Sequence, residues 1–247
     1  MLAIIGGSGL TRLSTLAVGR REVVRTPYGE PSSALVFGQV AGREVVFLAR
    51  HGHGHTIPPH RVNYRANLWA LDKSGVRTIL AVASVGGIAD EYAVGDLVLP
   101  HQLIDYTSGR ENTFFDGGDR EVVHVDFTRP YSEPLRERCL AAARSTGISV
   151  HDGGVYAAVS GPRLETAAEI DRLARDGATL VGMTGMPEAV LARELGVAYA
   201  TIAVVVNHAA GRGDSALSVS MESIVGVLET AMDKVRSLID QVLQETP

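Results

Sequence analysis

Short apolar runs and amphipathic stretches alternate along most of the chain. Apolar, β-branched runs bounded by glycine or polar residues predict buried strands, and these cover residues 2–5, 23–24, 34–37, 45–49, 78–85, 96–100, 154–159, 178–181 and 197–206. Helical periodicity and helix-boundary residues predict helices at residues 63–73, 132–146, 166–175, 187–194 and 221–244. Because strands alternate with helices, the pattern indicates an α/β fold.

The stretch from Val181 to Asn207 has the most informative pattern. Gly182–Gly185 is a turn whose two glycines let the backbone approach a ligand. A short helix from Pro187 leads into the apolar run 197–206, which stops at Asn207. A polar amide at the C-terminal end of a buried strand lies where open α/β proteins hold ligands. An isolated asparagine at such a place more often only ends a turn.

Composition narrows the class of protein. The 247 residues carry no linker-like or low-complexity segment, so we expect one domain over residues 1–247. The net charge of −5 disfavours a nucleic-acid surface. The start Met1–Ile5 lacks the pattern of a signal peptide, and no apolar run reaches the ~20 residues that span a bilayer. We therefore expect a soluble, cytoplasmic protein without a membrane partner.

Two further features stand apart from the regular pattern. Cys139 is the one cysteine and lies in a helical pattern, so packing is its expected role. Residues 106–130 are polar, rich in glycine and charged residues, and have little periodicity. Loops of that length are often functional.

Several predicted strands end in turns that could hold an anion. Gly6–Gly9 follows the first strand and could direct backbone N–H groups at a phosphate, although it lacks the third glycine of the dinucleotide fingerprint. Ser8, Arg50–His51 and Thr184 each lie where a predicted strand gives way to a glycine-containing turn. If these strand ends converge, hydroxyls, N–H groups and one guanidinium would surround a small anion. The sequence therefore predicts a phosphate pocket built from distant segments.

A histidine cluster allows three interpretations. His51, His53, His55 and His60 fall within ten residues. A metal site, and with it a metallohydrolase, is one of them. Against it, no carboxylate lies between Arg50 and His60, and Arg50 is unfavourable beside a cation. An anion site fits better, and the third alternative is that the histidines only complete the hydrogen bonds of a proline-rich loop.

Five motifs in order along the chain resemble one known family. They are Ile4–Leu10, Arg50–Gly52, Pro59–Asn67, Gly161–Thr166 and Gly182–Ala189. Together they resemble the trimeric purine nucleoside phosphorylases, and within that group the methylthioadenosine phosphorylase branch. The resemblance covers nearly the whole chain.

This resemblance implies a fold and a reaction. The fold is of the phosphorylase type, with a mixed, partly barrel-like sheet flanked by helices, in a homotrimer without metal or organic cofactor. The reaction is phosphorolysis, in which a purine nucleoside and inorganic phosphate give a free purine and a ribose 1-phosphate. The sugar gains positive charge while negative charge grows on the departing purine. The protein must therefore place the phosphate and donate a hydrogen bond to the base.

The resemblance also assigns roles by position. Phosphate binding falls to Ser8, Arg50, His51, Ser84 and Thr184. Met183 would pack against the ribose, and Leu164 stands where the family usually places a phenylalanine near the base. His124 matches a histidine that the family lends to a neighbouring subunit's active site. We expect Asn207 and Thr184 to act in catalysis.

Two positions bear on the choice of base. Asn207 replaces an aspartate of the methylthioadenosine enzymes. A carboxyl group suits a 6-amino purine, whereas an amide always carries an NH2 donor for the 6-oxygen or N7 of hypoxanthine or guanine. Glu165 could accept the N1–H that a 6-oxopurine has and adenine lacks. Both positions favour a 6-oxopurine.

The last expectation concerns the side chains that would contact the 5′ end of the sugar. Inosine-type members place a histidine near the start of the last helix, whereas this chain has Val219 and Met221, which suit a methylthio group. An apolar pocket rejects a hydroxyl only ~10²-fold. The combination favours S-methyl-5′-thioinosine as the substrate. The alternatives are inosine and guanosine, methylthioadenosine, or a nucleoside that is bound without being cleaved.

Overall fold

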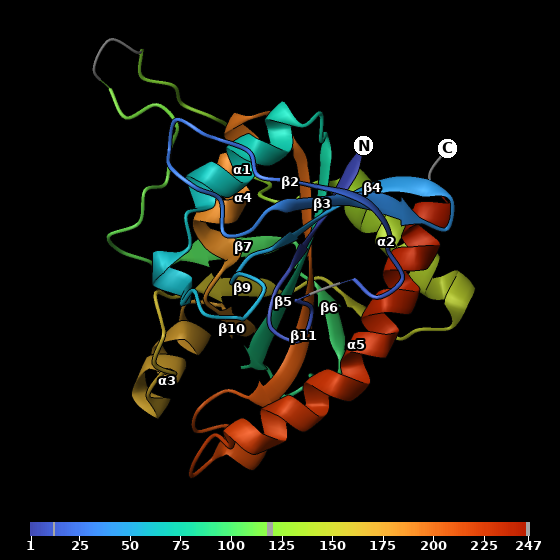
Figure 1. Cartoon of the computed structure of the whole chain (residues 1–247). Helices are drawn as coiled ribbons and strands as arrows, with labels where there is room; N and C mark the ends of the chain where they lie inside the picture. Colours follow the sequence, from blue (N-terminus) through green and yellow to red (C-terminus); the bar gives the residue numbers. More distant parts are fainter. Residues whose placement is uncertain (12, 118–120, 246–247) are drawn as a thin grey trace.

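The computed structural model describes residues 1–11, 13–117 and 121–245. Within them the strands join into one 11-stranded mixed sheet (Figure 1). Its main path is β2-β3-β4-β1-β5-β10-β9-β7, and β11, β6 and β8 continue from β5 along a second path. The strands are β1 (Leu2–Gly6), β2 (Ala17–Glu22), β3 (Leu35–Val40), β4 (Arg43–Ala49), β5 (Thr78–Gly87), β6 (Leu97–Leu99), β7 (Gln102–Asp105), β8 (Val150–Asp152), β9 (Val155–Ala158), β10 (Leu180–Gly182) and β11 (Ala198–His208).

Strand β5 is the centre of the sheet. It pairs in parallel with β11 along its whole length, and on its other edge it pairs first with parallel β1 and then with antiparallel β10. Side chains of the helices cover both faces of this region, which is why β5 and β11 are almost continuously apolar. Because β4, β1, β5 and β11 are parallel neighbours, their carboxyl ends lie at the same edge.

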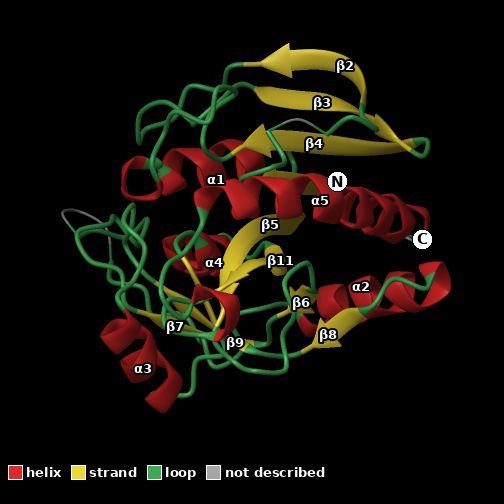
Figure 2. Ribbon diagram, turned by 90° about the horizontal axis from the view of Figure 1, so that it is seen from below, coloured by secondary structure: helices red, strands yellow, loops and turns green. Residues whose placement is uncertain are grey.

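Helices form a layer on each face of the sheet. Helices α2 and α5 lie on one face and α1 and α4 on the other (Figure 1). The buried side chains of each pair pack against the strands on their own face. Figure 2 shows β2, β3 and β4 at one end of the molecule and α3 at the opposite end. The helices are α1 (Tyr64–Lys73), α2 (Glu133–Thr146), α3 (Ala167–Arg175), α4 (Gly185–Glu194) and α5 (Met221–Gln244), with 3-10 turns η1 (Pro59–Arg61) and η2 (Gly213–Ser215).

Side-chain caps fix several helix starts. Asn63 accepts the N–H of Ala66 at α1, and Ser220 accepts the N–H of Ser223 at α5. Thr166 and Glu169 form a capping box at α3. None of the helices in the described ranges is both long enough and apolar enough to cross a membrane.

Most predicted elements are present, but one predicted strand is wrong and two observed strands were not predicted. The predicted strand at Val23–Val24 is wrong, because the strand is Ala17–Glu22 and Val23 is 72% exposed. Strands β7 and β8 were not predicted. Cys139 is buried in α2, as predicted, and burial raises the pKa of its thiol to about 12. Between β7 and α2, residues 106–117 and 121–132 contain no helix or strand.

Candidate active site

A cavity of about 520 Å³ opens where the parallel strands end. Its walls come from the ends of β1, β4, β5, β10 and β11, from the segments before α1 and α3, and from the start of α5. The structure thus brings together ten of the predicted site residues, which are Ser8, Arg50, His51, Ser84, Leu164, Glu165, Met183, Thr184, Asn207 and Met221.

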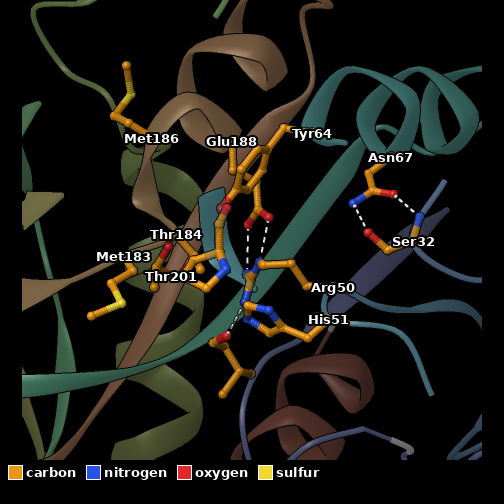
Figure 3. Close-up of polar contacts among 12 residues, drawn as sticks. Ser32, Arg50, His51, Tyr64, Asn67, Met183, Thr184, Met186, Glu188 and Thr201 are labelled. Atoms are coloured by element: carbon orange, nitrogen blue, oxygen red, sulfur yellow. Dashed lines mark hydrogen bonds and ion pairs between the residues drawn. The ribbon is translucent and has the colours of Figure 1, made fainter. Parts of the chain in front are cut away.

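Arg50 is the buried cation of the cavity wall. Its Nε and Nη2 donate to the two carboxylate oxygens of Glu188 at 2.6 and 2.7 Å, and its Nη1 donates to the carbonyl of Val82 at 3.0 Å (Figure 3). Burial opposes its charge, but the carboxylate of Glu188 outweighs burial and raises the pKa of Arg50 above its usual range. A guanidinium has five N–H donors, and three of them bond to described residues, so two are without a partner among the described residues.

A polar network behind the cavity holds Glu188 in place. Its carboxylate also accepts the hydroxyl of Tyr199 at 2.8 Å, and Thr201 donates to that hydroxyl at 3.2 Å. Glu188 is 0% exposed. Its place in the first turn of α4 alone would indicate only a carboxylate that favours the positive end of the helix. Glu188 is also the counter-ion of Arg50, a role that becomes visible only when the fold brings the end of β4 to the start of α4.

His51 is held as a neutral imidazole. Its Nδ1 lies 2.8 Å from the carbonyl oxygen of Ile57, which fixes the proton on that nitrogen. Burial, helped by the charge of Arg50, lowers the pKa of His51 to about 4. Its Nε2 is therefore a hydrogen-bond acceptor near pH 7. Such an acceptor suits a phosphate oxygen that carries a proton.

Hydroxyl-bearing side chains line the cavity together with Arg50 and His51. Ser8 lies 3.4 Å from Nε2 of His55, and the Ser84 hydroxyl lies 3.5 Å from the carbonyl of Ser8. Thr184 is buried at the start of α4, where its N–H donates to the hydroxyl of Tyr156 at 3.4 Å. The three hydroxyls come from the ends of β1, β5 and β10. This arrangement is the convergence of strand ends that the sequence predicted.

A β-bulge places Asn207 on the cavity. Val205 pairs with Val85 and Asn207 with Gly86, so Val206 is an extra residue in β11. Val206 and Asn207 both line the cavity, although successive residues of a regular strand face opposite sides. Nδ2 of Asn207 donates to the carbonyl of His208 at 2.6 Å. The described residues therefore take one of its two N–H donors.

Glu165 and Leu164 line the same cavity from the segment that precedes α3. Burial raises the pKa of the Glu165 carboxyl group. Leu164 is 38% exposed, so its side chain is free to cover a ligand. This part of the cavity wall therefore has one polar side chain, Glu165, and one apolar side chain, Leu164.

The start of α5 supplies an apolar part of the wall. Met221, Ile224 and Leu228 line the cavity, and Met221 is 62% exposed. Val219 does not line it but packs against the core formed with α5 and α2. Ile224 and Leu228 lie on the buried stripe of α5, and periodicity cannot separate a core stripe from the part of it that reaches a cavity.

The histidine cluster does not converge. His51 and His55 lie with ring centroids 4.7 Å apart, whereas His53 and His60 are exposed and do not line the cavity. No group of three or more His, Cys, Asp or Glu side chains that could hold a metal ion occurs within the described ranges.

His124 lies apart from this cavity. It is exposed in the stretch between β7 and α2 and does not line the cavity of its own chain. Its neighbours Val122 and Val123 are also exposed, at 72% and 41%.

Comparison with known proteins identifies the family. A sequence model of the phosphorylase superfamily matches residues 1–244, and the chain belongs to this family. It is an enzyme of the pentosyltransferase type.

Three similar proteins show which activities occur among relatives of this chain. A probable S-methyl-5′-thioinosine phosphorylase of Pseudomonas syringae pv. tomato is 54% identical over 241 residues, which cover 98% of this chain and 97% of that protein. A 6-oxopurine nucleoside phosphorylase of Pyrococcus furiosus is 44% identical over 251 residues, covering 100% of this chain and 92% of that protein. Among solved structures, methylthioadenosine phosphorylase from Schistosoma mansoni in complex with adenine superposes with a TM-score of 0.94 at 33% identity, covering 98% of this chain and 90% of that one.

Proposed function

We propose that the chain catalyses the phosphorolysis of S-methyl-5′-thioinosine to hypoxanthine and S-methyl-5-thioribose 1-phosphate, a reaction of purine salvage. The observation that carries the proposal is that one cavity combines an amide, Asn207, with apolar side chains from the start of α5. The 54% identical relative bears the name of this activity, which supports the proposal.

The base is recognised by Asn207 and Glu165. The second N–H of the Asn207 amide donates to N7 or the 6-oxygen of the purine, where negative charge grows as the glycosidic bond breaks. Glu165, when ionised, accepts the N1–H that a 6-oxopurine has. A donor of this kind is worth about 3 kcal/mol in the transition state.

The phosphate binds to Arg50, His51, Ser8, Ser84 and Thr184. Arg50 supplies two N–H donors at a fixed position, because its other donors are taken by Glu188 and Val82. The carboxylate of Glu188 offsets the charge of Arg50, and His51 is neutral, so hydrogen bonds rather than net charge select the anion. These groups hold the phosphate at the anomeric carbon while the sugar becomes positively charged.

The sugar lies against Met183 and the start of α5. Met221 and Ile224 contact the methylthio group, and Leu164 covers the base. Residues 1–247 act as one domain, with inorganic phosphate as co-substrate and no metal or organic cofactor. The enzyme works in the cytoplasm as a homotrimer, and His124, which is exposed on its own chain, reaches the cavity of a neighbouring subunit.

A second candidate is 6-oxopurine nucleoside phosphorylase activity on inosine and guanosine. The specific observation in its favour is that Met221 is 62% exposed, so the 5′ end of the sugar lies beside solvent that can hydrate a hydroxyl. The relative from Pyrococcus furiosus that is named for this activity is 44% identical.

Base release in the presence of phosphate tests the proposal. The four substrates are S-methyl-5′-thioinosine, methylthioadenosine, inosine and adenosine. We expect the highest kcat/KM for S-methyl-5′-thioinosine. A preference for methylthioadenosine would contradict the role given to Asn207, and a preference for inosine would support the second candidate.

The substitution Asn207→Asp sharpens the test. It should move the preference towards the 6-aminopurine substrates, because a protonated carboxyl group donates to the ring and its other oxygen accepts from the 6-amino group. Asn112→Asp is the matched control, since Asn112 is exposed and lies outside the cavity. The control should keep the substrate order of the original chain.

A further inference from the structure

Arg110 lies in the stretch between β7 and α2, and its guanidinium joins three segments of the chain. Nη1 donates to the carbonyl oxygens of Met183 and Met186 at 2.8 and 2.5 Å, and Nη2 donates to the carbonyl of Ser160 at 2.9 Å. Nη1 also lies 3.3 Å from the hydroxyl of Tyr64, whose ring centroid is 5.3 Å from the guanidinium carbon. One cation thus donates to carbonyl groups of two separate segments.

These carbonyls belong to two walls of the cavity. Met183 lies in the turn from β10 into α4, and Met186 is at the start of α4 (Figure 3). Ser160 follows β9 and begins the segment that carries Leu164 and Glu165 into the cavity. Arg110 itself does not line the cavity.

The two walls contact each other tightly where Arg110 joins them. A Cβ atom on Gly161 would lie 2.3 Å from Sδ of Met183, so glycine at this position allows the walls to meet. In the proposed function, Met183 contacts the sugar and Leu164 and Glu165 contact the base. The spacing between the walls therefore sets how sugar and base lie relative to each other.

We propose that Arg110 is a positioning residue for the nucleoside part of the site. It holds the Met183 turn and the Ser160–Glu165 segment at a fixed separation, and so places the sugar and the base for attack by phosphate. Four of the five proposed phosphate-binding side chains, Ser8, Arg50, His51 and Ser84, lie at β1, β4 and β5, and none of the hydrogen bonds of Arg110 involves these strands. Only Thr184 lies in the turn that Arg110 holds, so the phosphate site depends on Arg110 less than the nucleoside site does. The identity of the nucleoside rests on the proposed function, but the holding of the two walls does not.

Arg110→Met and Arg110→Lys test this role, with steady-state KM measured separately for nucleoside and for phosphate. We expect Arg110→Met to raise the nucleoside KM on the order of tenfold or more, and the phosphate KM by less than about threefold. The nucleoside KM of Arg110→Lys should lie between those of Arg110→Met and the unsubstituted protein. An ammonium group keeps the charge but does not have the planar fork of a guanidinium.

Arg193→Met is the matched control. Arg193 extends from α4 and donates to the carbonyls of Asp126 and Arg129, in the same stretch that carries Arg110, but it lies outside the cavity. The substitution Arg193→Met removes the same kind of contact, a guanidinium bound to backbone carbonyls, and should leave both KM values unchanged. Equal increases in both KM values for Arg110→Met, or the same change in the control, would overturn the proposal.

Amide hydrogen exchange without substrate separates this proposal from the proposed function. In Arg110→Met, exchange in residues 159–165 and 183–186 should be at least about tenfold faster than in the original chain and in Arg193→Met. This readout is independent of which nucleoside is cleaved. Unchanged exchange in both segments would refute the role of Arg110, whereas absent base release with faster exchange would refute only the proposed function. If Arg110→Met does not fold, the same comparison is made with Arg110→Lys.

Discussion

Removal of Glu188 should destabilise the protein far more than removal of an exposed carboxylate. Arg50 and Glu188 are 1% and 0% exposed, and two charged hydrogen bonds of 2.6 and 2.7 Å join them. Glu188→Ala leaves the guanidinium buried without its counter-ion and also removes the acceptor of the Tyr199 hydroxyl. Breaking one partner of a buried pair costs about 3–5 kcal/mol.

The corresponding change in melting temperature can be estimated. For a chain of this size, 1 kcal/mol corresponds to a shift of roughly 2–4 °C, so Glu188→Ala should lower Tm by roughly 6–20 °C. Glu188→Gln keeps one acceptor and the shape of the side chain. Its Tm should therefore lie between those of Glu188→Ala and the unsubstituted protein. The loss of a fixed Arg50 should also raise the phosphate KM in both variants.

Urea and thermal unfolding at one protein concentration provide the assay. Asp233→Ala is the control, because Asp233 pairs with Arg236 at 2.7 Å on α5 but its side chain is 82% exposed. An exposed pair of this kind contributes little. If Glu188→Ala and Asp233→Ala shift the unfolding midpoint equally, the buried pair does not stabilise the fold as inferred here.

Two other changes test the cavity. Burial and the charge of Arg50 lower the pKa of His51 from 6.5 to about 4, so the unfolded chain binds more protons between these values and stability should fall by about 3 kcal/mol as pH drops through them. His51→Gln should flatten that part of the curve in pH-dependent urea unfolding, and parallel curves would contradict the inference. Gly161→Ala adds a Cβ at φ +61°, 2.3 Å from Sδ of Met183, and should raise the nucleoside KM. Gly42→Ala has a similar backbone (φ +77°) with no atom within 4 Å among the described residues, and should cost only backbone strain, measured as a loss of stability without a change in KM.

The regular elements could be predicted because burial on both faces leaves a simple pattern. Strand β11 is apolar from one end to almost the other, and α5 repeats its apolar positions along 24 residues. Strand β2 gave no such signal, since all six of its residues are exposed at the edge of the sheet. Strands β7 and β8 are short. Pairing of β7 with β9 and of β8 with β6 determines their extended conformation more than their own sequence does.

The site was predictable only in part. Ser8, Arg50, His51 and Thr184 follow strands and precede glycine, and the cavity contains all four. The partners that hold them could not be predicted. Glu188 lies in a motif near the cavity but pairs with Arg50, which is 138 residues away, and Arg110 belongs to a stretch without periodicity. Asn207 was noticed as a polar end to an apolar strand, but its direction depends on the extra residue Val206, which alternation along the strand does not show.

In the proposed function, the bulge at Val206 separates the choice of purine from the construction of the sheet. Position 207 faces the cavity because of the backbone offset between β11 and β5, whatever side chain occupies it. An exchange of that one side chain can therefore alter which nucleobase is accepted while the strand pairing on either side stays as it is. Deletion of Val206 would have the opposite effect, because it would remove the bulge and change the backbone at the end of β11 without altering the chemistry of the amide group.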